Sequence, residues 1–216
     1  MPDKITIQPR PNHRVGVFVD MQNLYHSAKN LHGARINFAE LVKLASANRQ
    51  IVRALVYVVK SGETDEKAFF DALEKSGLEL KMKDLQVFAG GAKKADWDVG
   101  MAVDVISLAK QLDVVVLATG DGDFVPLVEY LQHNGVIVEA MSFGRSTSLR
   151  LKEVVNNYID LDEQRKILMG IPGQGPARRT TRSAGGRTRS TAKQPAPSAS
   201  PISESFMAPR IHRDEE

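Results

Sequence analysis

An unbroken apolar run leads directly into two aspartates in the sequence VVVLATGDGDFVP, residues 114–126. Such a run is typical of a strand covered on both faces of a parallel sheet. The glycines Gly120 and Gly122 permit backbone angles that other residues resist, so a sharp turn can present Asp121 and Asp123. The sequence therefore predicts a buried strand, an acidic loop and a helix. A solvated turn with a helix cap is the alternative interpretation of the loop.

The same alternation of apolar runs and amphipathic segments continues along most of the chain. We predict strands over residues 15–19, 51–59, 84–88, 114–118, 136–141 and 157–160. Helices are predicted over residues 22–32, 38–48, 64–76, 97–111, 124–134 and 147–156. Strands separated by helices imply right-handed crossovers, so we expect an α/β fold, a three-layer α/β/α sandwich with a mainly parallel, Rossmann-like sheet.

The composition changes at both ends of the chain. We predict a flexible leader over residues 1–13, a folded domain over residues 14–162 and a basic, low-complexity, largely disordered tail over residues 163–216. From residue 171 onward there are eight Lys and Arg residues against four Asp and Glu residues. Such a segment buries too little apolar surface to offset its ordering entropy. Its basic charge serves either to bind phosphate groups or only to keep the chain in solution.

Several classes of protein are excluded by what the sequence lacks. The absence of cysteine rules out disulfides and thiolate metal sites. No apolar segment approaches the roughly 18 residues that a membrane span needs, and the N-terminus lacks the long apolar segment of a signal peptide. We therefore expect a soluble cytoplasmic protein without membrane association.

Acidic residues also occur at two other elements of the predicted sheet. Asp20 ends the apolar run VGVFV, and Asp98 lies in the first turn of a predicted helix, where the dipole favours negative charge. Because the carboxyl ends of parallel strands meet at one edge, we expect Asp20, Asp98, Asp121 and Asp123 to converge. Their mutual repulsion favours a hard divalent cation, Mg²⁺ or Mn²⁺. Taken singly, Asp20 is equally consistent with a helix cap and Asp98 with a surface residue.

Other residues lie beside these acids in the sequence. Asn23 either caps the first helix or holds Asp20 or a bound phosphate, and Lys94 either contacts a substrate strand or is simply solvated. Trp97 either stacks on a base or packs against the sheet. Asp104 lies roughly 240° around the helix from Asp98, so we rank it as an accessory acid at the rim.

The buried face of that helix is predicted from its apolar residues. These are Val99, Ala102, Val103 and Ile106. On a second helix, Leu149 and Leu151 are candidates for the core or for the surface of a homodimer.

Three motifs at this spacing resemble the NYN domain of the PIN-like nuclease superfamily, in its LabA-like branch. They are VFVDMQN at residues 17–23, the segment from Lys94 to Asp104, and TGDGDFVPLV at residues 119–128. A later GVIV strand at residues 135–138, followed by Ser148-Leu149, extends the similarity, which covers residues 14–162. The resemblance implies a Rossmann-like sandwich whose acidic pocket binds a divalent metal and hydrolyses RNA.

The resemblance also implies roles for individual residues. Asp20, Asp98, Asp121 and Asp123 become the catalytic, metal-binding carboxylates, Asn23 and Thr119 become polar residues at the pocket edge, and Asp104 an accessory acid. We therefore expect a metal-dependent ribonuclease that acts on RNA, in single-stranded form. A non-catalytic RNA- or protein-binding regulatory module and a small-molecule phosphohydrolase are the alternatives.

Overall fold

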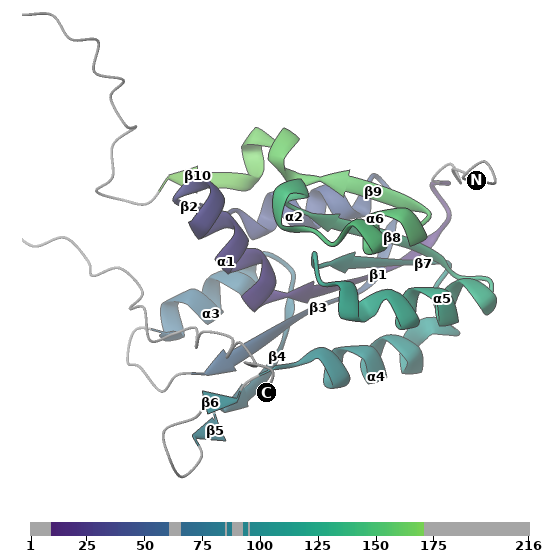
Figure 1. The fold of residues 1–216 in the computed structure, drawn as a ribbon, viewed down its shortest axis with the longest axis horizontal. Coiled ribbons are helices and arrows are strands. Elements are labelled where there is room, and N and C mark those ends of the chain that lie inside the picture. The colour runs from purple at the N-terminus through teal and green to yellow at the C-terminus, as the bar shows by residue number, and fades with distance from the viewer. Residues whose placement is uncertain (1–9, 61–65, 85, 88–92, 95, 171–216) are drawn as a thin grey trace, which may run out of the picture.

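A parallel sheet of six strands forms the centre of the protein (Figure 1). The computed structural model describes residues 10–60, 66–84, 86–87, 93–94 and 96–170. The strand order is β4-β3-β1-β7-β8-β9, so the first strand lies in the middle and the sheet grows outward from it in both directions. The strands are β1 (Arg14–Asp20), β3 (Gln50–Lys60), β4 (Glu79–Asp84), β7 (Val114–Ala118), β8 (Ile137–Ser142) and β9 (Asn157–Asp160). The carboxyl ends of the neighbours β1 and β7 therefore form a topological switch point, where open α/β sheets bind ligands.

Three helices of the described chain cover each face of this sheet. On one face lie α1 (Met21–His32), α2 (Phe38–Ser46) and α3 (Glu66–Lys75), and on the other lie α4 (Asp98–Ala109), α5 (Val125–His133) and α6 (Leu149–Val154). Short 3₁₀ turns follow the strands, namely η1 (Gly122–Phe124), η2 (Gly144–Ser146), η3 (Leu161–Glu163) and η4 (Arg165–Ile167). Successive strand residues point to opposite faces, so Val17 packs with the first layer and Phe18 with the second. The predicted three-layer sandwich is confirmed.

The strand predicted at residues 84–88 is wrong in its position. One of the two edge strands of the sheet is β4, which ends at Asp84, and it pairs in parallel with β3. Its side chains alternate with a period of two, but both faces at this edge are partly open, so charged residues occupy one of them. Because lysines alternate with apolar residues here, the sequence shows no continuous apolar run, and the strand that begins at Glu79, shortly after α3, was not recognised.

Two small antiparallel sheets were not predicted. One pairs β2 (Ala34–Ile36) with β10 (Leu168–Gly170), and the other pairs β5 (Gln86–Val87) with β6 (Lys93–Lys94). Because Ile167 is buried and β10 is paired, the folded part extends to Gly170, past the predicted boundary at residue 162. The predicted leader, through residue 9, and the tail from residue 171 lie outside the described residues. Within the described chain, every helix is too short or too polar to cross a bilayer.

The buried face predicted for α4 is wrong at three of its four residues, because only Ala102 is partly buried and packs against the core. Val99, Val103 and Ile106 are 75%, 56% and 41% exposed, while Met101 and Val105 are buried against the sheet. Apolar residues occupy nearly every side of α4, so periodicity alone could not identify the inward face. The true inward face has a functional consequence, because Asp98 lies three residues before Met101 and seven before Val105, on the same side.

A buried ion pair joins the end of α2 to β8. Arg49 donates two hydrogen bonds to Glu139, at 2.9 Å (Nη1 to Oε1) and 2.7 Å (Nη2 to Oε2), and their side chains are 1% and 3% exposed. Arg49 also donates to the carbonyls of Ala45 and Ser46, and Asn157 donates to Glu139 Oε1. Both charges are therefore fully engaged in hydrogen bonds inside the core.

A second ion pair closes the amino end of the sheet. Arg14 donates from its backbone N–H and its guanidinium to Asp113, at 2.8 to 3.1 Å. The hydrogen bonds from Arg14 lower the pKa of Asp113 to about 2. This pair joins the first residue of β1 to the residue just before β7, at the end of the sheet opposite the switch point.

Candidate metal centre

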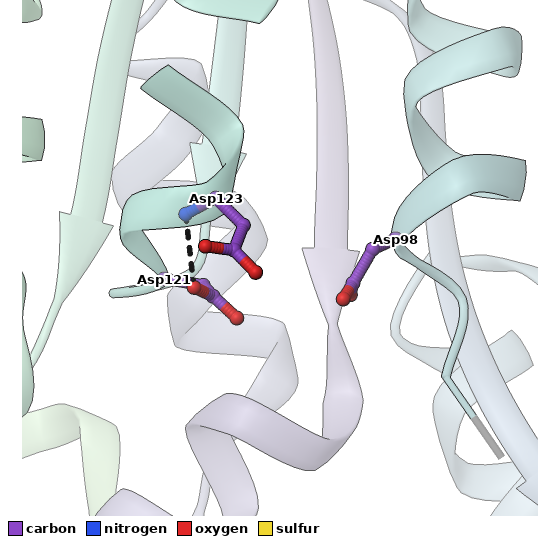
Figure 2. A group of neighbouring side chains, drawn as sticks. All are labelled: Asp98, Asp121 and Asp123. Carbon is purple, nitrogen blue, oxygen red and sulfur yellow. Dashed lines mark hydrogen bonds between the residues drawn. The ribbon is translucent and has the colours of Figure 1, made fainter. Parts of the chain in front are cut away.

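Asp121 and Asp123 lie on one short turn at the end of β7. Asp121 is the N-cap of η1, and its Oδ1 accepts a hydrogen bond of 3.0 Å from the Asp123 N–H (Figure 2). This hydrogen bond from the backbone two residues on to the Asp121 side chain closes the turn, so the two aspartates are held on one short loop. Asp121 is half-buried and Asp123 is exposed, which gives the pair one protected and one open side.

The glycines of this loop are needed for space, and the predicted need for unusual backbone angles is wrong. Among the described residues, positive φ angles occur at other glycines, Gly33, Gly77 and Gly135. A Cβ on Gly120 would lie 3.1 Å from the Ser146 carbonyl oxygen, and one on Gly122 would lie 2.7 Å from Ser148 Oγ. The acidic loop therefore packs directly against the segment that follows β8.

Asp98 comes from α4, on the opposite side of the switch point. It is the first residue of the helix and faces Asp121 and Asp123 in Figure 2. Just before it, the Trp97 indole N–H donates a 2.9 Å hydrogen bond to the Val58 carbonyl of β3. A Cβ on Gly100 would lie 2.6 Å from the Trp97 ring. Trp97 therefore packs against the sheet and the first turn of the helix, which holds Asp98 in place.

The three aspartates form a compact set of oxygen ligands. One carboxylate oxygen from each of Asp98, Asp121 and Asp123 lies within 4.8 Å of the other two. Oxygens bound to one Mg²⁺ at about 2.1 Å are about 3–4 Å apart, so small side-chain rotations would bring all three onto a single ion. Two of the residues are half-buried and one is exposed, which suits a hard cation that keeps part of its water. The residues present fit such an ion.

Asp20, the fourth predicted carboxylate, does not belong to this set of three. It is the N-cap of α1, and its Oδ1 accepts the Asn23 N–H at 3.0 Å. Its Oδ2 accepts a 3.1 Å hydrogen bond from Thr119 Oγ1, which in turn accepts the Asp121 N–H at 3.2 Å. Capping turns the carboxylate toward the helix, so Asp20 is connected to Asp121 through the Thr119 hydroxyl.

Asn23 and Thr119, predicted as substrate-binding residues at the pocket edge, hold the framework of the site. The Asn23 side-chain carbonyl accepts the Gly120 N–H at 2.8 Å, which fastens α1 to the acidic loop. Thr119 is 0% exposed, so its hydroxyl is out of reach of a substrate. Asp20, rather than Asn23, caps the helix.

Asp104, predicted as an accessory acid, contacts groups other than the three carboxylates. Asp104 accepts a 3.1 Å hydrogen bond from the Tyr57 hydroxyl and forms a 3.2 Å ion pair with Lys81. Burial, and then the negative charge of Asp104, raise the pKa of Tyr57. Lys94 pairs with Gln86 in the small β5–β6 sheet, and its side chain lies outside the described residues.

A basic residue that the sequence analysis missed lies close to the start of α4. Lys83 Nζ donates to the Asp96 carbonyl at 3.1 Å and lies 5.8 Å from the centre of the Trp97 ring. The alternation of residues 79–84 places Lys83 on the same side of β4 as Lys81. This position could have been predicted from the sequence if the strand had been located correctly.

Comparison with known proteins identifies a family and a similar fold. The NYN domain family matches residues 14–162. The chain is 26% identical over 168 residues to the "Low amplitude and bright protein LabA" of Synechococcus elongatus, a match that covers 74% of this chain and 89% of that protein. The crystal structure of a protein of unknown function from Vibrio parahaemolyticus is similar with a TM-score of 0.68 and 28% identity, over 76% of this chain and 100% of the other. The match to the NYN domain family covers the central sheet, the acidic loop and most of the chain's length. The chain therefore belongs to the NYN domain family.

Proposed function

We propose that this protein is a metal-dependent ribonuclease that hydrolyses phosphodiester bonds in single-stranded RNA. The observation that carries the proposal is the set of three carboxylates within 4.8 Å of one another at the switch point of the sheet. Membership of a nuclease-type family is consistent with the same chemistry. A flexible single strand can bring a phosphodiester to carboxylates that are partly buried, which a stiff duplex does less readily.

The residues divide into those that hold the ion and those that position them. Asp98, Asp121 and Asp123 would hold Mg²⁺ or Mn²⁺, and Asp20 adds a negative charge two hydrogen bonds away from the Asp121 amide. When bound, such an ion polarises a phosphoryl oxygen and makes water a better nucleophile at neutral pH. The exposed Asp123 would orient that water from the open side of the site.

Basic groups near the cluster supply contacts to the RNA backbone. Lys83 contacts the carbonyl of Asp96, a residue two positions before Asp98, and would offer a phosphate contact there. Lys94 keeps its predicted role of contacting the substrate strand. The basic tail adds phosphate contacts that weaken steeply as salt concentration rises.

The test compares cleavage of a labelled single-stranded RNA by the purified wild type, by Asp121→Asn and by Asp71→Asn. Asp71 is an exposed aspartate on α3 and serves as the matched control. With Mn²⁺ or Mg²⁺ we expect cleavage by the wild type and the control, and a loss on the order of 100-fold or more in Asp121→Asn. EDTA should abolish all cleavage.

The opposite outcome identifies the alternative function. If the purified wild type leaves single-stranded RNA intact with both metals, the nuclease proposal is wrong, and a chain that also releases no phosphate from nucleotides acts as a binding module. Release of phosphate from nucleotides, with RNA left intact, would instead indicate a small-molecule phosphohydrolase. Filter binding of the same RNA then shows whether the acidic cluster takes part in association.

A further inference from the structure

The outer face of α4 carries an apolar stripe that no element of the described chain covers. Val99, Val103 and Ile106 follow one another at intervals of four and three residues, which places them on one side of the helix. They are 75%, 56% and 41% exposed. α4 packs against α5 on one side only and forms the outer edge of its layer (Figure 1). An isolated exposed valine is ordinary, but an aligned row of three at the end of a layer indicates a contact surface.

The stripe is complementary to itself when two copies run antiparallel. A two-fold axis at Val103 pairs Val103 with its own copy and brings Val99 to the level of residue 107 of the second copy, one residue from Ile106, which is about 1.5 Å along the helix. The same register places Asp96, which precedes the helix, beside the exposed Lys110 that follows it. Apolar residues therefore meet apolar residues, and opposite charges meet at both ends. The other charged residue at the middle of the helix, Asp104, is turned away toward Lys81 and Tyr57.

We infer that α4 is the interface of a homodimer in which two copies pair these helices antiparallel. A closed two-fold interface uses the same surface twice, which is the symmetry that the residue order of α4 satisfies. A foreign protein or the chain's own tail has no reason to match an acid at one end and a base at the other in this way. Because one helix pair buries little area, we expect a weak dimer whose population depends on concentration.

Pairing would bring the second copy close to each acidic cluster. Asp98 lies five residues from Val103, so the two copies of Asp98 would be about 15 Å apart along the helix axis. Lys110 of the second copy would lie near the start of α4, at the rim of the carboxylate set. The inference rests on the outer face of α4 and holds whether or not the site cleaves RNA.

The absence of cysteine makes a direct test possible. Helix axes about 8–10 Å apart bring facing Cα atoms to about 4–5 Å, which a disulfide can span. We expect Val103→Cys in the full-length chain to form a covalent dimer under mild oxidation, seen on a non-reducing gel. Leu149→Cys is the matched control, since Leu149 is 74% exposed on α6, away from this surface. Equal cross-linking of the two variants would overturn the interface.

Sedimentation velocity tests the same interface without cross-linking. Val103→Glu should raise the dimer dissociation constant at least about tenfold, while Leu149→Glu should leave it unchanged. Lys110→Glu should also weaken the dimer, and adding Asp96→Lys should restore it. A wild type that stays monomeric at all concentrations, as expected if the tail or another protein covers the stripe, refutes the inference. Failure of the charge reversal to restore association refutes the antiparallel register.

Discussion

Replacing Asp121 by asparagine should stabilise the protein when no metal is present. Asn keeps an oxygen that can accept the Asp123 N–H, so the η1 turn is retained while one charge is lost. The change removes two repulsive pairs at no more than 4.8 Å. Each pair costs about 0.9 kcal/mol in water and about 3.5 kcal/mol at an effective dielectric constant of 20. Taking the water-like value for both pairs gives a lower limit, so the gain in unfolding free energy is at least about 2 kcal/mol.

Thermal unfolding measured with and without metal provides the assay. In EDTA, a gain of about 2 kcal/mol corresponds to a Tm roughly 4–8 °C higher for Asp121→Asn than for the wild type. Mn²⁺ at about 100 times its dissociation constant should stabilise the wild type by about 2.7 kcal/mol, and the variant much less. The difference between the Tm values of the variant and the wild type should therefore narrow or change sign when the metal is added. Asp71→Asn, on α3, should change neither value.

The reasoning depends on repulsion that a cation relieves, so its failure is easy to recognise. If Asp121→Asn melts at or below the wild-type temperature in EDTA, the carboxylates do not repel one another appreciably. If Mn²⁺ raises the Tm of both proteins equally, the ion binds elsewhere. Either result would remove the physical basis of the proposed metal centre.

Three further predictions concern the rest of the fold. Arg49→Met should lower the unfolding free energy by about 3–5 kcal/mol, because it leaves Glu139 charged and buried, and Glu139→Leu in the same chain should restore most of it in urea titrations. Asp113→Asn should be less stable than the wild type at neutral pH. Because the folded-state pKa of Asp113 is lowered from 3.8 to about 2, this difference should shrink as pH falls from 4 toward 2, and a pH-independent difference would contradict it. Truncation after Gly170 should leave the Tm unchanged, whereas truncation after residue 162 should lower it by removing buried Ile167 and β10, as calorimetry can show.

The central sheet was predictable because its strands are buried on both faces. Residues 114–118 and 157–160 were predicted with the bounds that β7 and β9 have. The elements β1, α1, α4 and α5, which flank the switch point, were located within two residues. Continuous apolar runs leave little choice of structure. The edge strand β4 was misplaced because an edge needs only one apolar side.

The candidate site was predictable in its composition and less so in its arrangement. The strand order brings the loop after β7 to the carboxyl edge of the sheet, and the helix α4 that leads into β7 begins at the same edge. The convergence of Asp121 with an acid from α4 could therefore be expected. The direction of a single side chain does not follow from topology. Asp20 was expected among the ligands, yet its hydrogen bonds to Asn23 and Thr119 depend on the local geometry of a helix cap. The need for glycine at position 122 likewise depends on a segment that comes much later in the chain.

The hydroxyl between Asp20 and Asp121 determines how a substitution at position 20 must be interpreted. An ionised carboxylate only accepts, so the single Thr119 proton points to Asp20 and its lone pair receives the Asp121 N–H. An asparagine at position 20 that presented its NH₂ group instead would reverse this proton order and leave the Thr119 proton without its acceptor. An inactive Asp20→Asn protein would therefore report a disturbed loop as readily as a missing ligand. Asp20→Glu and Thr119→Val, measured together, separate the two causes.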